Sequence, residues 1–233
     1  MNNPLRIIVA CNHFPVASGR YITDALRNLG HDVRTLGDST GNRIWGMTVD
    51  PKYAWQSDGD LTKHWHDWKP DLIILADSAW QYHHPVYQDT PHIVWGVDNH
   101  VRDYRQAGIA HFFLAHKSVS LMPFNSTITG EPITDYVTWL PCATSSAFTP
   151  SPIPFYERYF DVCLVGVLYE RRIELLNALH KAGLKVFAQT GLLYDEYQAA
   201  YHNSRISLCV SANQDVAQRI FETAAFGCAI LTD

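Results

Sequence analysis

Long apolar runs are missing from this sequence, and no stretch approaches the roughly 18 apolar residues that a membrane-spanning helix needs. The amino-terminal stretch MNNPLRIIVACNHF has a short apolar run without a basic region before it, which is unlike a secretory signal. Basic residues are not in excess, since the net charge is −5, so no global positive field would attract nucleic acid or an anionic membrane. We therefore expect a cytoplasmic protein without a membrane span and without a general nucleic-acid-binding signal.

Cysteine pairs are also absent. The five cysteines are scattered and form no CxxC pair, which favours free thiols in a reduced protein. Two close histidine pairs are present, His64 with His66 and His83 with His84. Neither pair has the i, i+4 spacing with an acidic partner that a helical zinc site uses, and no cysteine completes a site. We expect no bound metal.

Three catalytic signatures are missing as well. The sequence has no GxGxxG fingerprint and no GxxxxGK[ST] loop, which disfavours a Rossmann dehydrogenase and removes P-loop chemistry. Ser145 and Ser146 lack the context of a nucleophile elbow, so a serine hydrolase is disfavoured too.

What the sequence does have is an alternation of β-branched runs and helical periodicity. RIIVAC is typical of a parallel strand buried on both faces, Ile22, Leu26 and Leu29 repeat at helical spacing, and HDVRTLG is a second strand. Further strand-like runs follow at similar spacing: PDLIILAD, TPHIVWGVDNH, AHFFLAHKS and DYVTWLPCA. This pattern predicts a doubly wound parallel sheet.

The segment from 39 to 70 is aromatic-rich and weakly periodic. Within it, LTKHWHDW predicts a helix that would place Leu61, Trp65 and Trp68 on one face. Core packing is the default interpretation of the tryptophans, although Trp45, Trp55 and Trp65 are also candidates for the wall of a sugar-stacking cleft.

The alternation of strands and helices is interrupted near residue 150. Three prolines fall within five residues there, and neither a helix nor a sheet would continue through them. After them the alternation of strands and helices restarts. The predicted organisation is an N-terminal domain, a proline-rich linker and a C-terminal domain over residues 1–150, 151–158 and 159–233. The fold class is therefore α/β, with two Rossmann-like domains built on parallel sheets.

The second domain has only four strand-like runs, where a Rossmann-like domain has about six. We expect this domain to be incomplete, with the chain being either a fragment of a longer protein or a truncated gene product. The last strand, CAILTD, would then leave an unpaired edge through which the chain could self-associate.

The helix-forming stretch DVAQRIFETAAFG is nearly apolar, yet it carries Arg219 and Glu222 at i, i+3 spacing. One interpretation is a surface ion pair of a few tenths of a kcal/mol. The other is a ligand site, because open α/β sheets bind ligands at the carboxyl ends of their strands. A carboxylate in that place could accept hydrogen bonds from both hydroxyls of a ribose.

Two loops that follow strands add candidates. Gly166 follows a buried strand, and Arg171 and Arg172 open the next helix, an arrangement that suits a diphosphate or is simply an exposed helix start. The equivalent loop of the first domain contributes Ser18 and Gly19. Polar side chains that follow another strand, as a base or acceptor-binding site or as an ordinary turn, are Asp98 and His100.

Four stretches together resemble group 1 glycosyltransferases of GT-B architecture, especially the spore-maturation-protein-like branch: RIFETAAFGCAILTD, DVCLVGVLYERRIELLNAL, VTWLPCATSSAFTP and PHIVWGVDNH. The first is similar to the R-x-F-E-x-x-A-x-G signature, whose glutamate, here Glu222, binds the donor ribose in that family. The chain departs from the family at Gln214, where many relatives have a second glutamate, and at Val167, where they often have a basic residue. The family's C-terminal domain also continues beyond ILTD.

The resemblance implies a metal-independent, retaining hexosyltransferase that uses a nucleotide-sugar as co-substrate and no further cofactor. The donor diphosphate would lie at Gly166–Arg172 and the ribose at Glu222, with Arg219 beside it, and the acceptor near Ser18, Gly19, Asp98 and His100. Positive groups and helix N-termini would stabilise the departing nucleoside diphosphate. Two alternatives stay open, a non-catalytic nucleotide- or partner-binding relative and, less favoured, a nucleotide-sugar epimerase.

Overall fold

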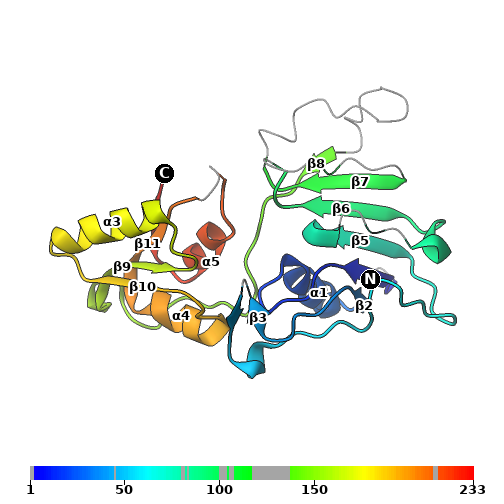
Figure 1. Ribbon diagram of the computed structural model, residues 1–233, viewed down its shortest axis with the longest axis horizontal. Helices are drawn as coiled ribbons and strands as arrows, with labels where there is room; N and C mark the ends of the chain where they lie inside the picture. The colour runs from blue at the N-terminus through cyan, green and yellow to red at the C-terminus, as the bar shows by residue number, and fades with distance from the viewer. Residues whose placement is uncertain are drawn as a thin grey trace. The chain divides into compact units, whose positions relative to one another are not determined.

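The computed structural model describes residues 3–44, 46–79, 82, 84–99, 104, 108–116, 137–211 and 215–233 (Figure 1). The chain divides into two compact units, Met1–Pro141 and Cys142–Asp233. Each unit has its own parallel sheet flanked by helices, which confirms the predicted α/β class with two Rossmann-like units. Among the helices of the described residues, none combines the length and hydropathy that crossing a membrane would take.

The first unit is built on a six-stranded sheet in which every neighbouring pair is parallel. Its spatial order is β2 (Asp32–Leu36), β1 (Arg6–Ala10), β5 (Leu72–Ala76), β6 (His92–Gly96), β7 (Ile109–Leu114) and β8 (Val137–Trp139). The chain moves outward from β1 in one direction to β2 and in the other direction to β5. The strand order therefore reverses between β1 and β5, the place where open α/β sheets bind ligands.

The two faces of this sheet are covered differently. Helix α1 (Ser18–Asn28) packs Ile22 and Leu26 on the face formed by Ile7 and Val9. The opposite face is covered by aromatic side chains, including Trp68 and three buried tyrosines, Tyr82, Tyr87 and Tyr104. Alternate strand residues thus enter two separate cores, as the doubly wound pattern requires.

The helix predicted over 61–68 is wrong, because these residues form turns and extended chain. The backbone N–H of Trp65 donates to the hydroxyl of Tyr87 (3.1 Å), and the indole N–H of Trp68 donates to Asp32 (2.8 Å). Arg34 lies over both indole rings. Tertiary hydrogen bonds and cation–π contacts therefore replace the helical ladder that the apolar spacing indicated.

Short elements occupy the connections of the first unit. Strands β3 (Arg43–Ile44) and β4 (Met47–Thr48) form an antiparallel hairpin in the connection from β2 to β5. Single 3₁₀ turns are η1 (Pro51–Tyr53), η2 (Asp77–Ala79) and η3 (Pro85–Tyr87). η2 begins directly after β5, so its first residue lies at the carboxyl edge of the sheet.

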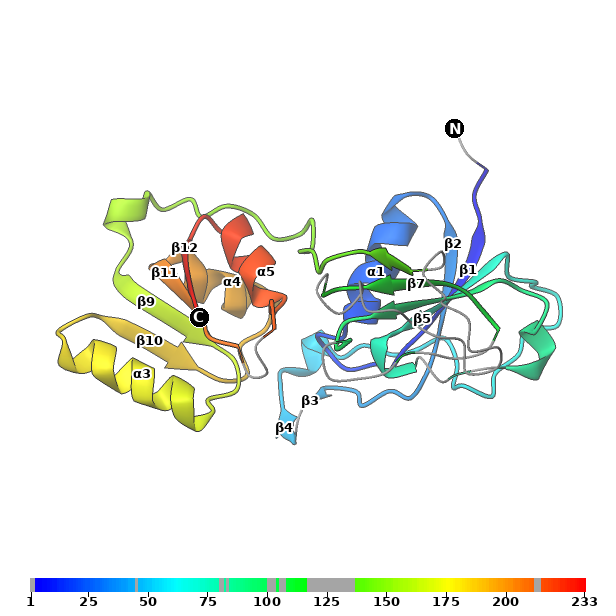
Figure 2. The same ribbon diagram turned by 90° about the horizontal axis from the view of Figure 1, so that it is seen from above.

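The second unit has a four-stranded parallel sheet in the order β10 (Val186–Gln189), β9 (Phe160–Val165), β11 (Ser204–Cys209) and β12 (Ala229–Thr232). Helix α3 (Glu170–Lys181) covers one face, and α4 (Tyr194–His202) and α5 (Arg219–Ala225) cover the other (Figure 2). The strand order reverses between β9 and β11. β12 is an edge strand of this sheet, and self-association through it stays a prediction.

The two units divide between Pro141 and Cys142, ahead of the boundary at residue 150 that the sequence indicated. Phe148 packs edge-to-face on Phe226 of the second unit (ring centroids 5.0 Å apart). The proline-rich segment 151–158, which contains η5 (Phe155–Glu157), is attached there too, since the backbone N–H of Ser151 donates to the carbonyl of Phe226 (3.2 Å). It ends at the buried Arg158, which donates hydrogen bonds to the carbonyls of Ser204 and Gly227. The chain after 141 is thus anchored to the second core by an aromatic ring and a buried guanidinium.

Candidate functional site

The carboxyl ends of β9 and β11 form the candidate site of the second unit, because the strand order reverses between them. Gly166 follows β9 and Val210 follows β11. Gly166 has a positive φ of 145°, and a Cβ added to it would lie only 2.3 Å from Nη2 of Arg219. The backbone conformation therefore favours glycine here, and a larger side chain would displace the guanidinium that lies over it.

Arg172 holds the two loops of this site together. Its Nε and Nη2 atoms donate to the carbonyl of Val210 (3.0 and 2.6 Å), and Nη1 donates to the carbonyl of Val167 (2.7 Å). The side chain is buried. Its pKa is lowered mainly by this burial and to a smaller extent by the nearby charge of Arg219. Sequence reasoning placed Arg172 at the diphosphate, whereas the structure gives all three of its nitrogen atoms carbonyl partners.

The side chain of Arg171 is exposed and pairs with Asp233. It is 61% exposed, and its Nη1 atom forms an ion pair with Asp233 (2.7 Å). The other carboxylate oxygen of Asp233 accepts the backbone N–H of Ser211 (3.1 Å). This backbone hydrogen bond, together with Arg171, lowers the pKa of Asp233. Arg171 is thus paired at the carboxyl end of β12.

Arg219 is the third cation of the site. It is the first residue of α5, and its guanidinium reaches across to Gly166. The guanidinium makes no hydrogen bond or ion pair within the described ranges, and its Nη1 atom is buried without a partner there. Burial alone would lower the pKa of Arg219, but the surrounding Tyr201 and Tyr197, with Cys209 and Glu222, raise it. The group therefore stays charged.

Glu222 lies one turn further along α5 and is half-buried. The hydroxyl of Tyr197 donates to its Oε2 atom (2.8 Å), and the side-chain amide of Gln218 donates to Oε1 (3.1 Å). Burial and then Glu222 raise the pKa of Tyr197, so its proton stays on the hydroxyl. The surface ion pair with Arg219 that the spacing allowed is not formed in the described part of the chain.

This geometry fixes the orientation of the Glu222 carboxylate. Each oxygen of a carboxylate has two acceptor positions, so a carboxylate held in this way can also bind a pair of vicinal hydroxyls. Helix α5 thus carries a held carboxylate and, one turn before it, a guanidinium that has no partner among the described residues. Sequence reasoning found Arg219 and Glu222 but missed Tyr197 and Gln218. Nothing in the pattern distinguishes Tyr197 from the other aromatic residues of its helix.

In the first unit the predicted acceptor-side residues are spread over the sheet. Gly19 is buried, and a Cβ there would lie 2.3 Å from Sγ of Cys11, so this glycine permits the close packing of α1 on β1. Ser18 is half-buried at the first position of α1. Asp98 follows β6, which β5 separates from β1. His100 lies outside the described residues.

Sequence reasoning missed Asp77, which follows β5 at the reversal of strand order in the first sheet. Asp77 has a positive φ of 43°, a conformation that aspartate tolerates better than most residues. Its carboxylate accepts a hydrogen bond from the buried hydroxyl of Tyr104, which in turn accepts the backbone N–H of Asp98 (3.1 Å). Burial and then Asp77 raise the pKa of Tyr104. Tyr104 thus joins the ends of two neighbouring strands.

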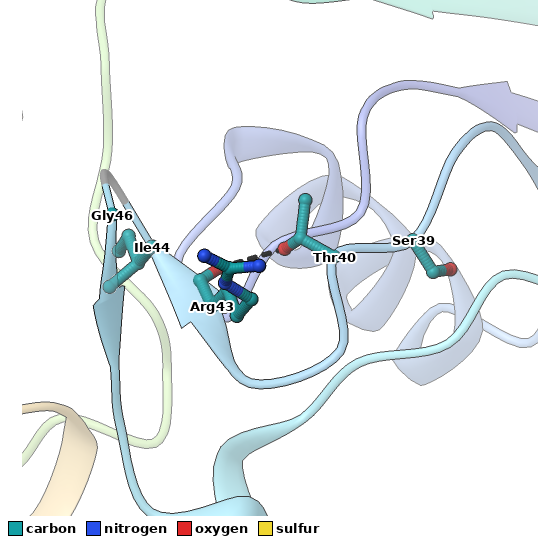
Figure 3. A pocket seen from close by; sticks show the side chains of 5 residues that line it. All are labelled: Ser39, Thr40, Arg43, Ile44 and Gly46. Atoms are coloured by element: carbon teal, nitrogen blue, oxygen red, sulfur yellow. Dashed lines mark hydrogen bonds between the residues drawn. The ribbon is translucent and has the colours of Figure 1, made fainter.

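A hollow of about 460 Å³ lies beside the β3–β4 hairpin of the first unit (Figure 3). Its lining consists of Ser39, Thr40, Arg43, Ile44 and Gly46. The Thr40 hydroxyl donates to the carbonyl of Arg43 (2.7 Å), which closes one side. Arg43 is the charged member of this lining. The hollow is large enough for part of a small polar substrate.

The histidines and tryptophans have packing partners. His64 contacts the Tyr87 hydroxyl (3.0 Å), and the described residues contain no group of three or more His, Cys, Asp or Glu side chains placed to hold a metal. Trp55 packs on His13, with ring centroids 4.1 Å apart. Trp65 packs on Trp68. Trp55 and Trp65 thus have the default role of packing against neighbouring side chains. His83 and Trp45 lie outside the described residues, as does Gln214.

Comparison with known proteins finds a family model and several solved structures that are similar to this chain. A family model described as glycosyl transferase-like matches residues 156–233, about a third of the chain. A search of curated proteins found no match. A solved structure of an "alpha-glucosyltransferase in complex with UDP and a 13-mer DNA containing a central A:G mismatch" is similar in fold, with a TM-score of 0.61 and 10% identity over 98% of this chain and 79% of that one.

The matched residues contain the whole candidate site of the second unit, from Gly166 to Glu222. The assignment to the spore-maturation-protein-like branch stays a prediction. The resemblance to glycosyltransferases is confirmed: residues 156–233 match the glycosyl transferase-like family, and the chain has the GT-B fold of a glycosyltransferase.

Proposed function

We propose that the protein transfers a hexose from a nucleoside-diphosphate sugar to an acceptor hydroxyl, with retention of configuration and without a metal. The observation that carries this proposal is Glu222, a carboxylate held by Tyr197 at the carboxyl edge of the second sheet, inside the region that matches the family. The resemblance assigns the donor ribose to this glutamate. A carboxylate with two acceptor positions on each oxygen suits the two ribose hydroxyls.

The donor base is proposed to be uracil. The support is the similar α-glucosyltransferase, whose structure contains UDP. The rest of the donor would extend along the Gly166 loop toward the start of α3, where Tyr169 provides no side-chain cap for the first-turn amides. Amides at a helix start and a guanidinium can balance the charge of a diphosphate, so the chemistry needs no metal.

The acceptor is proposed to bind the first unit. Support comes from the reversal of strand order between β1 and β5, which is flanked by Ser18 and Asp77. The hollow around Arg43 is a second candidate for part of the acceptor. Retention of configuration rests on the family resemblance.

Isothermal titration calorimetry with UDP, GDP, ADP and dTDP tests the donor site. We expect UDP to bind the parent protein and Glu222→Gln to weaken binding about 10- to 100-fold, because hydrogen bonds to a charged group contribute about 1.5–3 kcal/mol. Glu174→Gln, on the exposed face of α3, is the matched control and should bind like the parent. A folded parent protein that binds none of the four nucleotides would refute the proposed donor site.

Turnover separates this function from its main alternative, a binding protein without catalysis. Release of UDP from UDP-glucose, measured with EDTA and with added Mg²⁺, should be detectable and equal in the two conditions. Binding of UDP without any release would favour the non-catalytic relative, and activity only with Mg²⁺ would overturn metal independence.

A further inference from the structure

Three arginines surround the loop that begins at Gly166, and the structure separates their roles. Arg172 uses its three nitrogen atoms to bind the carbonyls of Val167 and Val210. Arg171 is turned outward and paired with Asp233. Of the three guanidiniums, only that of Arg219 makes no hydrogen bond or ion pair with a described residue.

One nitrogen atom of the Arg219 guanidinium lacks a hydrogen-bond partner in the described part of the chain. Taking a cation out of water requires a compensating partner, and removing hydrogen-bond partners from a buried charged group costs more than removing them from a neutral one. The Nη1 atom of Arg219 is buried without such a partner among the described residues, and Arg172 adds a second positive charge nearby. An anion bound beside Arg219 would give this nitrogen atom an acceptor and would offset the repulsion between the two guanidiniums.

The position of the Arg219 guanidinium indicates that this anion is a phosphate group. Nη2 of Arg219 lies over Gly166, at the exit of β9, and the 12-residue helix α3 begins four residues later without a side-chain cap. Unpaired amides at a helix start favour a phosphate. Arg219 and the start of α3 thus supply two independent anion-binding features on the same loop, and Glu222 on the same short helix as Arg219 marks the ribose end.

We infer that Arg219 is the residue that binds the donor diphosphate, in place of the arginines of α3 and of the basic side chain that Val167 replaces. This inference rests on the proposed function and names a residue of the same site. When the anomeric carbon–oxygen bond breaks, its electron pair stays on the diphosphate. The acceptor oxygen forms the new bond and its proton is released to water. Arg219 balances the charge that develops on the leaving group.

Calorimetric binding of UDP and of uridine tests this role, because the two ligands differ only in the diphosphate. The parent protein should bind UDP more tightly than uridine. Arg219→Gln should reduce the ratio of the two affinities about tenfold or more and leave uridine binding unchanged. Lys181→Gln, which removes a positive charge from the far end of α3, is the control and should preserve the ratio.

The outcomes are distinguishable. A parent protein that binds neither ligand refutes the proposed function and this inference with it. A parent protein that binds UDP, with an unchanged ratio in Arg219→Gln, overturns the role of Arg219 alone, as does a loss of the ratio in Arg171→Gln only. If Arg219→Gln is unfolded by circular dichroism, Arg219→Lys decides. A severalfold lower ratio supports the inference, because the ammonium lacks the planar fork, and an unchanged ratio overturns it.

Discussion

The strongest stability prediction concerns Arg172, which forms a structural clamp between two loops. Replacing it by methionine removes three hydrogen bonds to the carbonyls of Val167 and Val210 while keeping much of the apolar stem. At about 1 kcal/mol for each contact the loss is about 3 kcal/mol, and the buried Val210 carbonyl is left without this partner. Burial and the charge of Arg219 disfavour the Arg172 cation, so its removal offsets part of this loss. We expect the free energy of unfolding to fall by about 2–4 kcal/mol.

Differential scanning calorimetry measures this effect. For a unit of this size, the expected loss lowers the melting temperature of the second unit by roughly 10 °C or more. Arg171→Met is the matched control, since it removes an adjacent arginine with an exposed ion pair and should cost less than about 1 kcal/mol. An Arg172→Met protein that melts like the parent but no longer distinguishes UDP from uridine would refute the clamp and return Arg172 to the diphosphate.

Three further predictions concern the first unit. Gly19→Ala should destabilise it by about 1–3 kcal/mol in urea unfolding, because the new Cβ would meet Sγ of Cys11, and unchanged stability would show that α1 can shift freely. Tyr104→Phe removes the hydroxyl that donates to Asp77 and should cost about 1–3 kcal/mol in the same assay; a neutral result would mean that water replaces the hydroxyl. Burial lowers the pKa of His13 from 6.5 to about 4. Because the unfolded state then binds the proton more tightly, stability should fall by up to about 3 kcal/mol as the pH drops from 6.5 toward 4, and His13→Gln should flatten this pH dependence.

The strands and helices could be predicted because each depends on local apolar spacing. RIIVA forms β1 and the Ile22–Leu26 repeat lies within α1, since both patterns match the faces that are buried. The predicted helix over 61–68 failed because Trp65 and Trp68 have partners far away in the chain, in Tyr87 and Asp32. Tertiary contacts of this kind are invisible to a periodicity argument.

Residues of the candidate site could be predicted from the sequence only where charged residues interrupt an apolar pattern. A charged pair on a nearly apolar helix singles out Arg219 and Glu222 from the sequence alone. Which arginine is left without a partner among the described residues depends on side-chain direction, and this cannot be read from the order GVLYERR. Asp77 was missed for another reason, since its importance comes from strand order, which places β5 rather than β6 next to β1.

The arginines around the Gly166 loop have different roles, and the role of Arg172 supports that of Arg219. A diphosphate bound between two loops must not pull them apart, and Arg172 fixes the distance between the ends of β9 and β11 by bonds to main-chain carbonyls. Arg219 is then held over Gly166 as a charge without a partner in the described part of the chain, because the clamp next to it supplies positive charge without supplying an acceptor. Repulsion between the two guanidiniums raises the energy of the empty site relative to the site filled by an anion. The same repulsion would oppose release of the nucleoside diphosphate after transfer, so we expect the product to bind more tightly than the uncharged nucleoside.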